Sequence, residues 1–440
     1  MIEKVSIENV LSFRDEETLS FVAKKERSEK TSNQLYNSVE LVNGVPLLKC
    51  VFFFGNNGAG KSNFIFALRN FAELVSSFKK KRNEKIPYAP FEFDDQTRKS
   101  PSKMSISYHI KDIRYTYRVD WDENYIRYEK LEKKIGRGKD RCIYERFYNE
   151  MQDTTEIIFS DASIDDDTRY QLKHSTISNT TVLSVISELN VPCTVLKDNF
   201  DFFDSSLNVT PMRGISLTGG LPVGRSAKEV VCKEVILGLI NDIGINIVDF
   251  DIVKHELPKE LLEKLNSIFT SEEIEKERYQ EVATFIHHTE KYGNKLLSES
   301  AQSDGTLAII KLMIAFYHTA IDGDCTILDE VTVGIQQKAF SRLLKFFLNI
   351  AGRSQLIFAS HDYSLLEFEY MRRDSVRFFS KNLDGVSSVQ TINLKNVHKN
   401  LNFRKYVLQN NKWGQLPQMC DDDTWVEHLD KYRNKIYHLQ

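Results

Sequence analysis

The chain has 440 residues, of which 41% are hydrophobic and 28% charged, and its formal net charge is −3. This balance is ordinary for a soluble globular protein with a large core, and the charge argues against a protein coated with nucleic acid over its whole surface while leaving a local basic face open. Six scattered cysteines without a Cys-x-x-Cys pair favour reduced thiols over disulfides or zinc. Because no apolar run approaches about 20 residues and the N-terminus lacks a signal-peptide core, we expect a cytoplasmic protein without a membrane span.

Residues 1–60 predict strands that lead into a phosphate-binding loop. Leu47 to Phe54 has the apolar character of a buried strand. The next residues read Gly55-Asn56-Asn57-Gly58-Ala59-Gly60-Lys61-Ser62, which fits the pattern G-x-x-x-x-G-K-[ST]. Apolar residues then recur at helical spacing from Lys61 to Phe78. Strand, loop and helix therefore agree with the context in which this motif binds nucleotides.

The residue types of this loop suit a phosphate group. Glycines let backbone N–H groups turn inward around phosphate oxygens, and the N-terminus of the helix adds partial positive charge. We expect residues 55–60 and Asn63 to line the nucleotide, Lys61 to reach the β- and γ-phosphates, and Ser62 to ligate Mg²⁺. The expected cofactors are ATP and Mg²⁺.

Residues 86–160 change to the alternation that is typical of antiparallel strands, as in Met104–Tyr108, Tyr115–Val119 and Ile126–Tyr128. They predict an antiparallel arm.

Two basic clusters accompany the arm and the helix before it. One is residues 79–82, and the other comprises Lys133, Lys134, Arg137, Lys139 and Arg141, with tyrosines nearby. Basic residues beside aromatic ones bind nucleic acid in some proteins, but a solvated loop is the commoner explanation.

Residues 161–245 are predicted to be mainly helical, most clearly at Thr181–Leu189 and Ala227–Leu239. Between these helices, Asn208–Arg225 is rich in Gly, Pro and Ser and is predicted to be a loop. We interpret the stretch as an insertion that supplies a lid or a partner surface. Residues 246–297 continue as strand, helix and strand.

A possible second anion site follows at residues 298–306. Ser303-Asp304-Gly305 precedes a predicted helix at Leu307–Ala320. Ser and Gly at the N-terminus of a helix can bind an anion.

Cys325 to Glu330 is an apolar strand that ends in two carboxylates. In phosphate-loop enzymes the first carboxylate holds the Mg²⁺ shell, and an adjacent one can deprotonate the attacking water. We assign these roles to Asp329 and Glu330. A predicted helix at Ile335–Ile350 is followed by the strand Gln355–Ala359. His361 comes shortly after the end of this strand, and we expect it to donate a hydrogen bond to the γ-phosphate.

This ordered set resembles the ABC-type ATPases, whose signature Ser-x-Gly closes over the ATP of a partner subunit. Ser303-Asp304-Gly305 matches that signature, although the Leu-Ser-x-Gly-Gln of transporters is not present. The chain is more specifically similar to the AAA-type, ABC-like ATPases of bacterial defence loci: the RloA/AbiL group and, more loosely, the ATPase subunits AriA of PARIS and PtuA of Septu. Further anchors of this resemblance are Ile7–Phe13, Leu19–Phe21, Glu299-Ser300, Asp304–Thr306, Gln355–Asp362 and Tyr406–Pro417.

The resemblance implies a homodimer or higher oligomer in which Ser303 and Gly305 cap the ATP of the partner. It also implies a Mg²⁺-contacting glutamine near the entrance of the arm, and Gln96 is the nearby candidate.

We therefore predict an α/β fold: an ABC/SMC-like P-loop ATPase head with an antiparallel β arm and a helical insertion. Its predicted parts are the N-terminal ATPase lobe 1–160, the helical insertion 161–245 and the C-terminal ATPase lobe 246–440. The expected function is ATP hydrolysis as the sensor or regulator subunit of an antiviral defence system that controls a separate effector, a nuclease.

Two alternatives remain open. One is a RecF-like DNA-repair ATPase that binds DNA directly. The other is a self-contained ATPase-nuclease like the OLD family, for which the segment after His361 is short.

Overall fold

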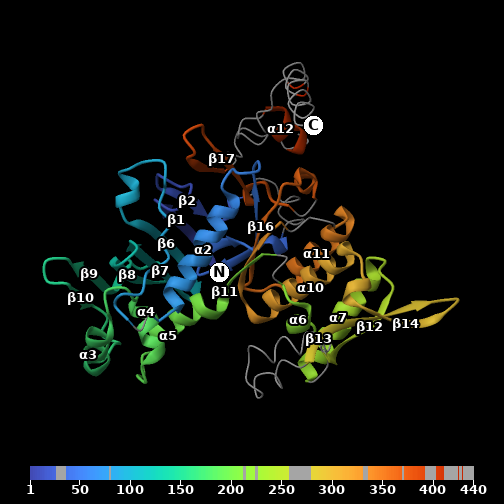
Figure 1. Ribbon diagram of the computed structural model, residues 1–440, viewed down its shortest axis with the longest axis horizontal. Coiled ribbons are helices and arrows are strands. Elements are labelled where there is room, and N and C mark those ends of the chain that lie inside the picture. The colour runs from blue at the N-terminus through green and yellow to red at the C-terminus, as the bar shows by residue number, and fades with distance from the viewer. Residues whose placement is uncertain are drawn as a thin grey trace, which may run out of the picture.

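The computed structural model describes residues 1–25, 36–78, 81–211, 215–222, 226–256, 279–330, 335–368, 371–391, 403–410, 425 and 429. Several predictions fall on residues outside this part: Lys79 and Lys80 of the first basic cluster, the helix expected between residues 246 and 297, and the 411–417 portion of the late motif. A mainly parallel sheet, a larger antiparallel sheet, two smaller antiparallel sheets and the helices between and around them build the described part (Figure 1).

The central sheet has the strand order β11-β15-β16-β5-β17-β18. Its strands are β5 (Cys50–Phe54), β11 (Leu207–Pro211), β15 (Cys325–Asp329), β16 (Gln355–Ala359), β17 (Val376–Lys381) and β18 (Ser387–Thr391). The first five strands of this order run parallel, and β18 pairs antiparallel with β17. β5 and β16 are buried at every position, as expected for parallel strands that are covered on both faces.

Alternate residues of β5 enter two separate cores. Val51 and Phe53 belong to the first core, and Phe52 and Phe54 belong to the second. This follows from the two-residue period of a strand. Helix α2 (Lys61–Ser76) packs in the first core, and helices α10 (Asp304–Asp322) and α11 (Gln337–Ile350) pack in the second.

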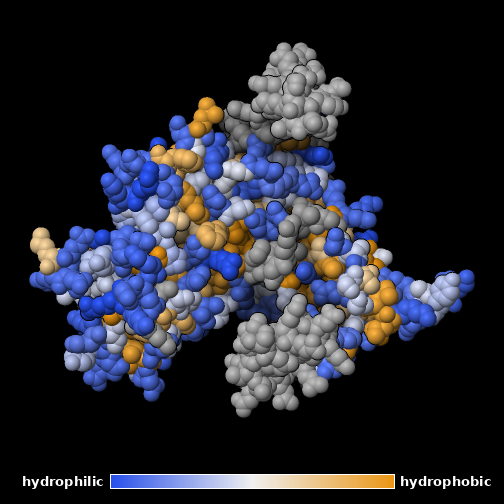
Figure 2. Space-filling view, in the orientation of Figure 1, coloured by the Kyte–Doolittle hydropathy of each residue, from blue (hydrophilic) through white to orange (hydrophobic). Residues whose placement is uncertain are grey.

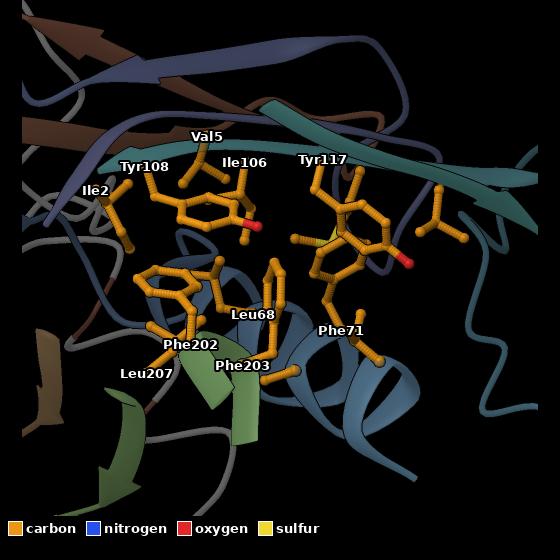
Figure 3. Close-up of a cluster of buried hydrophobic side chains, with 14 of the residues drawn as sticks. Ile2, Val5, Leu68, Phe71, Ile106, Tyr108, Tyr117, Phe202, Phe203 and Leu207 are labelled. Carbon is orange, nitrogen blue, oxygen red and sulfur yellow. The ribbon is translucent and has the colours of Figure 1, made fainter. Parts of the chain in front are cut away.

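The predicted arm is part of a seven-stranded antiparallel sheet in the order β10-β9-β8-β7-β6-β1-β2. Its strands are β1 (Ile2–Glu8), β2 (Glu17–Ser20), β6 (Ser102–Ile110), β7 (Ile113–Trp121), β8 (Ile126–Ile135), β9 (Arg141–Asn149) and β10 (Thr154–Phe159). Figure 3 shows Tyr108 and Tyr117 of this sheet pointing toward Leu68 and Phe71 of α2. The predicted α/β class with an antiparallel arm is confirmed.

The 161–245 stretch contains α3 (Asp166–Ser175), α4 (Val182–Glu188), α5 (Thr194–Asp201), the π-helical turn η3 (Phe202–Ser206), α6 (Leu217–Gly220) and α7 (Ala227–Asp242). It also contributes β11, which pairs with β15 at the edge of the central sheet. The prediction of a loop over Asn208–Arg225 was therefore wrong for β11 and α6. The three domain boundaries stay predictions.

Beyond α10 and α7 lies a small antiparallel sheet of β12 (Ile247–Glu256), β13 (Tyr279–Thr289) and β14 (Gly293–Ser298). The remaining elements are the hairpin β3 (Val39–Val42) and β4 (Val45–Leu48), helix α12 (Phe403–Asn410), and the short turns η1 (Tyr36–Ser38), η2 (Thr97–Lys99), η5 (Glu299–Ala301), η6 (Tyr363–Glu367) and η7 (Arg373–Ser375). In Figure 2, one group of hydrophobic residues lies where Figure 1 places α7 and β12, and both elements carry exposed valines.

Within the described part, one helix, α10, is long and apolar enough to cross a membrane, with a mean hydropathy of 1.2. Many of its apolar side chains, including Ile310, Leu312 and Phe316, pack in the second core. Burial against α11 and the central sheet thus explains its composition.

Candidate functional site

The carboxyl ends of β5, β15 and β16 bring the predicted site residues to one edge of the central sheet. These strands are neighbours in the order β15-β16-β5, and their register pairs Phe53 with Ala359 and Leu328 with Phe358. The phosphate loop, the acidic pair and His361 each follow one of these strands. This edge is where open α/β sheets bind ligands.

The phosphate loop leads into α2 through a left-handed residue. Gly60 is the N-cap of α2, with φ +108°, and no side chain caps the helix. The first backbone N–H groups of an α-helix have no partner within the helix, so an uncapped start can offer them to an anion. Gly58 and Asn57 are exposed, whereas Gly55, Ala59 and Gly60 are buried.

The Lys61 ammonium is buried in this loop, and the residue is only 4% exposed. Its Nζ donates hydrogen bonds to the carbonyl oxygens of Gly55 (2.6 Å) and Asn56 (3.1 Å) and lies 3.3 Å from Nδ1 of His361. Burial lowers the pKa of Lys61 to about 8, and the charges of Asp329 and Glu330 act in the opposite direction. The buried Lys61 ammonium thus donates to neutral carbonyl oxygens. A bound phosphate group would supply the negative charge that compensates it.

The acidic pair stands at the end of β15, with Asp329 as its last residue and Glu330 directly after it. Asp329 is half-buried, and its Oδ1 accepts a hydrogen bond of 3.0 Å from the backbone N–H of Glu330. Glu330 is exposed and has φ +57°, a left-handed conformation that is costly for a residue other than glycine. Such strain is common at functional sites.

His361 faces Lys61 from the end of β16. Burial and the charge of Lys61 lower the pKa of His361, so its ring is neutral at pH 7. Besides Lys61, the His361 ring has the backbone of Gly55 as a hydrogen-bond partner, so two groups of the phosphate loop hold the ring at this edge. Its neighbour Asp362 serves the fold instead, since its Oδ1 accepts from the backbone N–H of Ser364 in η6 (2.9 Å).

Ser303 and Gly305 lie on a different helix from the phosphate loop. Ser303 is the N-cap of α10, and its Oγ accepts from the backbone N–H of Thr306 at 3.1 Å. Gln302, directly before this cap, has a hydrogen-bond partner in the small sheet: its Oε1 lies 3.0 Å from Nε2 of His287 in β13. The role of Ser303 and Gly305 toward a second chain stays a prediction.

Gln96 is exposed just before η2, and its backbone N–H donates to Oδ1 of Asp94 at 2.9 Å. Its role toward Mg²⁺ stays a prediction.

Some of the basic residues near the arm have acidic partners. Lys133 pairs with Asp161, and Arg82 lies 3.9 Å from Asp153. These pairs reduce the positive charge of both clusters.

Two serines that the sequence does not single out lie directly behind the loop. Ser12 is 6% exposed and Ser387 is 1% exposed, and both contact the loop or the first turn of α2 through hydrogen bonds. Ser12 could have been found from the sequence, because it lies inside the N-terminal motif Ile7–Phe13.

Two solved structures are among those similar to this chain. The chain is similar to the SMC head domain from Thermotoga maritima, with 13% identity and a TM-score of 0.40, over 89% of this chain and 99% of that chain. It is also similar to an SMC head bound to the C-winged helix domain of ScpA, with 12% identity and a TM-score of 0.41, over 90% and 98% of the two chains. No curated protein gives a significant match.

A family model matches residues 50–367, which begin at β5 and end after His361. The match contains the phosphate loop, the signature residues and the acidic pair. Because it spans most of the sequence, the chain belongs to the family described as "AAA domain, putative AbiEii toxin, Type IV TA system".

Proposed function

We propose that this chain is a Mg²⁺-dependent ATPase that acts as the sensor or regulator subunit of a bacterial antiviral defence system. The observation that carries the ATPase part is the buried Lys61 ammonium, which shares one sheet edge with two carboxylates and a neutral histidine. These are the groups that phosphoryl transfer to water requires.

Binding begins with the phosphates. The Lys61 ammonium and the N–H groups at the start of α2 hold them, and Asn56, Asn57 and Asn63 line the same loop. Ser62 and Asp329 provide the hydroxyl and carboxylate oxygens that would hold Mg²⁺, whose chemistry when bound is to stabilise charge on the phosphate oxygens.

Hydrolysis needs a general base for the attacking water and a hydrogen-bond donor to the γ-phosphate. Glu330 takes a proton from the attacking water, for which its exposed carboxylate at the end of β15 is suited. His361, beside Lys61 at the end of β16, donates a ring N–H to the γ-phosphate.

The biological role rests on the resemblance and on the family. The family description names a putative AbiEii toxin and a type IV toxin–antitoxin system, which favours a defence role. We place the chain with the RloA/AbiL group, near the PARIS and Septu ATPases. We infer a cytoplasmic homodimer or higher oligomer, in which Ser303 and Gly305 of one chain cap the ATP of another. It controls a separate nuclease effector.

The experiment that tests the ATPase proposal is Glu330→Gln. The amide keeps the size of the side chain but cannot accept a proton from water, while phosphate binding depends on Lys61 and the loop. ATP binding should persist, and turnover should fall by about 10²–10⁴.

Binding is measured by titration calorimetry and turnover by phosphate release. Glu188→Gln, at the exposed last residue of α4, is the matched control and should leave both unchanged. An unchanged turnover rate in Glu330→Gln would remove Glu330 from the role of base.

A further inference from the structure

The hairpin β17–β18 lies directly against both ends of the phosphate loop. A Cβ atom built on Gly55 would lie 2.4 Å from the carbonyl oxygen of Phe379, and one on Gly60 would lie 2.4 Å from Oγ of Ser387. Atoms do not approach a Cβ so closely, and Gly60 also has a positive φ. The hairpin thus defines the space that the loop occupies.

A chain of side-chain hydrogen bonds joins this hairpin to the loop. Oγ of Ser387 lies 2.8 Å from Oγ of Ser12 and 2.9 Å from the carbonyl oxygen of Ala59, which can only accept. Nδ2 of Asn63, in the first turn of α2, donates to Oγ of Ser12 at 2.8 Å. The two serines therefore connect the residue before Gly60 with the helix that follows it.

Both serines are held in place by their backbones as well. The backbone N–H of Ser387 donates to the carbonyl oxygen of Ser12 at 2.7 Å. Ser12 belongs to a tight turn in which Val10 and Phe13 exchange backbone hydrogen bonds of 3.0 and 2.9 Å. The Phe13 ring packs edge-on against Phe64 of α2 at 5.9 Å. Removing either hydroxyl consequently leaves the serine backbone anchored.

We propose that Ser12 and Ser387 are positioning residues for nucleotide binding. Neither provides an N–H group of the loop nor a proposed Mg²⁺ ligand; they hold Ala59 and Gly60 in the turn that leaves the first N–H groups of α2 open. Without the hydroxyls, the turn has to be ordered when the nucleotide binds, which weakens affinity. This inference rests on the proposed ATPase function.

The test compares Ser387→Ala and Ser12→Ala with Ser388→Ala. Ser388 is the neighbouring residue in β18, and its Oγ lies 3.1 Å from Oγ of Ser380, so the control removes a hydroxyl of the same hairpin outside the Ser12–Ser387 hydrogen-bond chain. The dissociation constant is measured with a fluorescent ATP analogue and Mg²⁺, and KM and kcat are measured by phosphate release.

We expect the dissociation constant and KM to rise about 3- to 10-fold in both test variants, the size of one net hydrogen bond, with kcat changed by less than about 2-fold. The double variant should bind no more weakly than the weaker single variant, because both hydroxyls act along one path. Ser388→Ala should bind like the parent.

Separate outcomes judge the two proposals. If the parent chain does not bind ATP, or binds it as well after Lys61→Ala, the nucleotide site itself is wrong. If the parent binds ATP and Lys61→Ala does not, while Ser387→Ala and Ser12→Ala bind like Ser388→Ala, the positioning role is overturned. A lower kcat at unchanged KM also contradicts it. Should Ser387→Ala fail to fold, Ser12→Ala decides the matter.

Discussion

Single residues of the site differ in how far the sequence reveals them. Residues 55–63 are contiguous, so their motif predicts a local structure that the chain adopts at Gly60 and Lys61. Asp329 and His361 could be placed beside the loop because the carboxyl ends of parallel strands share an edge. Ser387 lies 375 residues from its partner Ser12. Only the packing of β18 behind the loop brings these two together, and no local pattern predicts that contact.

Asp324, just before β15, provides a pH-dependent test at the residue scale. Burial, reinforced by the charge of Asp322, raises its pKa to about 6 from the ordinary 3.8. The folded state therefore binds this proton more tightly than the unfolded state, so the contribution of Asp324 to stability falls as the pH rises from about 4 to about 6. We expect Asp324→Asn to stabilise the protein, and to do so more at pH 8 than at pH 5.

Urea unfolding at the two pH values measures this effect. Exposed Asp384→Asn serves as the control and should shift neither midpoint. The hydrogen bond from Nδ2 of Asn208 to Oδ2 of Asp324, at 2.9 Å, can be kept by an amide oxygen. An equal gain at both pH values would show that charge is not the cause.

At the scale of elements, alternation predicted the arm strands and helical spacing predicted α2, α4 and α7, because the periods of apolar residues differ between strands and helices. β11 was missed because its stretch is rich in residues that favour turns. Pairing with β15 and the hydrogen bond from Asn208 to Asp324 override that local preference. A strand that forms because of its pairing with a neighbouring strand cannot be recognised from its own residues.

A buried ion pair fastens α4 to the arm. Glu129 of β8 and Arg146 of β9 are fully buried, with Oε2 of Glu129 3.1 Å from Nη1 of Arg146. The Glu129 carboxylate also accepts from the hydroxyls of Tyr117 (2.8 Å) and Tyr144 (2.6 Å) and from the backbone N–H of Val182, at the start of α4. A negative charge at the N-terminus of a helix is favourable.

We predict that Glu129→Gln destabilises the protein by about 3–5 kcal/mol, because it leaves the buried Arg146 charge without its counter-ion. The free energy of unfolding is measured in urea. Glu132→Gln, on the same strand, is the matched control. Glu132 pairs with Lys130 where the two side chains are 27% and 28% exposed, so its loss should cost less than about 1 kcal/mol. If the free energy of unfolding fell equally in both variants, burial would not make the Glu129–Arg146 pair more important than the exposed pair.

At the scale of the whole molecule, the two halves of the chain complete one another. β5 and the phosphate loop come from the N-terminal half, whereas β15, β16 and β17 come from the C-terminal half, and they form one sheet. The sequence predicted this arrangement because the phosphate loop, the acidic pair and His361 each lie at or directly after the end of an apolar strand. Membership of the AAA family is confirmed. The defence subgroup, the partner and the effector stay proposals, because their contacts involve other molecules.

Self-association gives a prediction at this scale. If Ser303 and Gly305 cap the ATP of a second chain, Lys61→Ala and Gly305→Asp should each abolish turnover alone. A dimer of the two variants contains one complete site, formed by the intact phosphate loop of one chain and the intact signature of the other. An equal mixture should therefore regain up to about a quarter of the parent rate. Absence of rescue at any ratio, with both variants folded and associated, would contradict the composite site.

The last prediction concerns the effector. Within the described residues, no three His, Cys, Asp or Glu side chains group as a metal site. We expect the purified chain to hydrolyse ATP and to leave single- and double-stranded DNA and RNA intact in the presence of ATP with Mg²⁺ or Mn²⁺. Nuclease or toxic activity should require a second protein and should respond to Lys61→Ala and Glu330→Gln, because the nucleotide state sets the conformation that the effector meets. Cleavage that survives stringent purification, and that disappears when a carboxylate of this chain outside the ATP site is replaced, would contradict the separate effector and favour the self-contained nuclease.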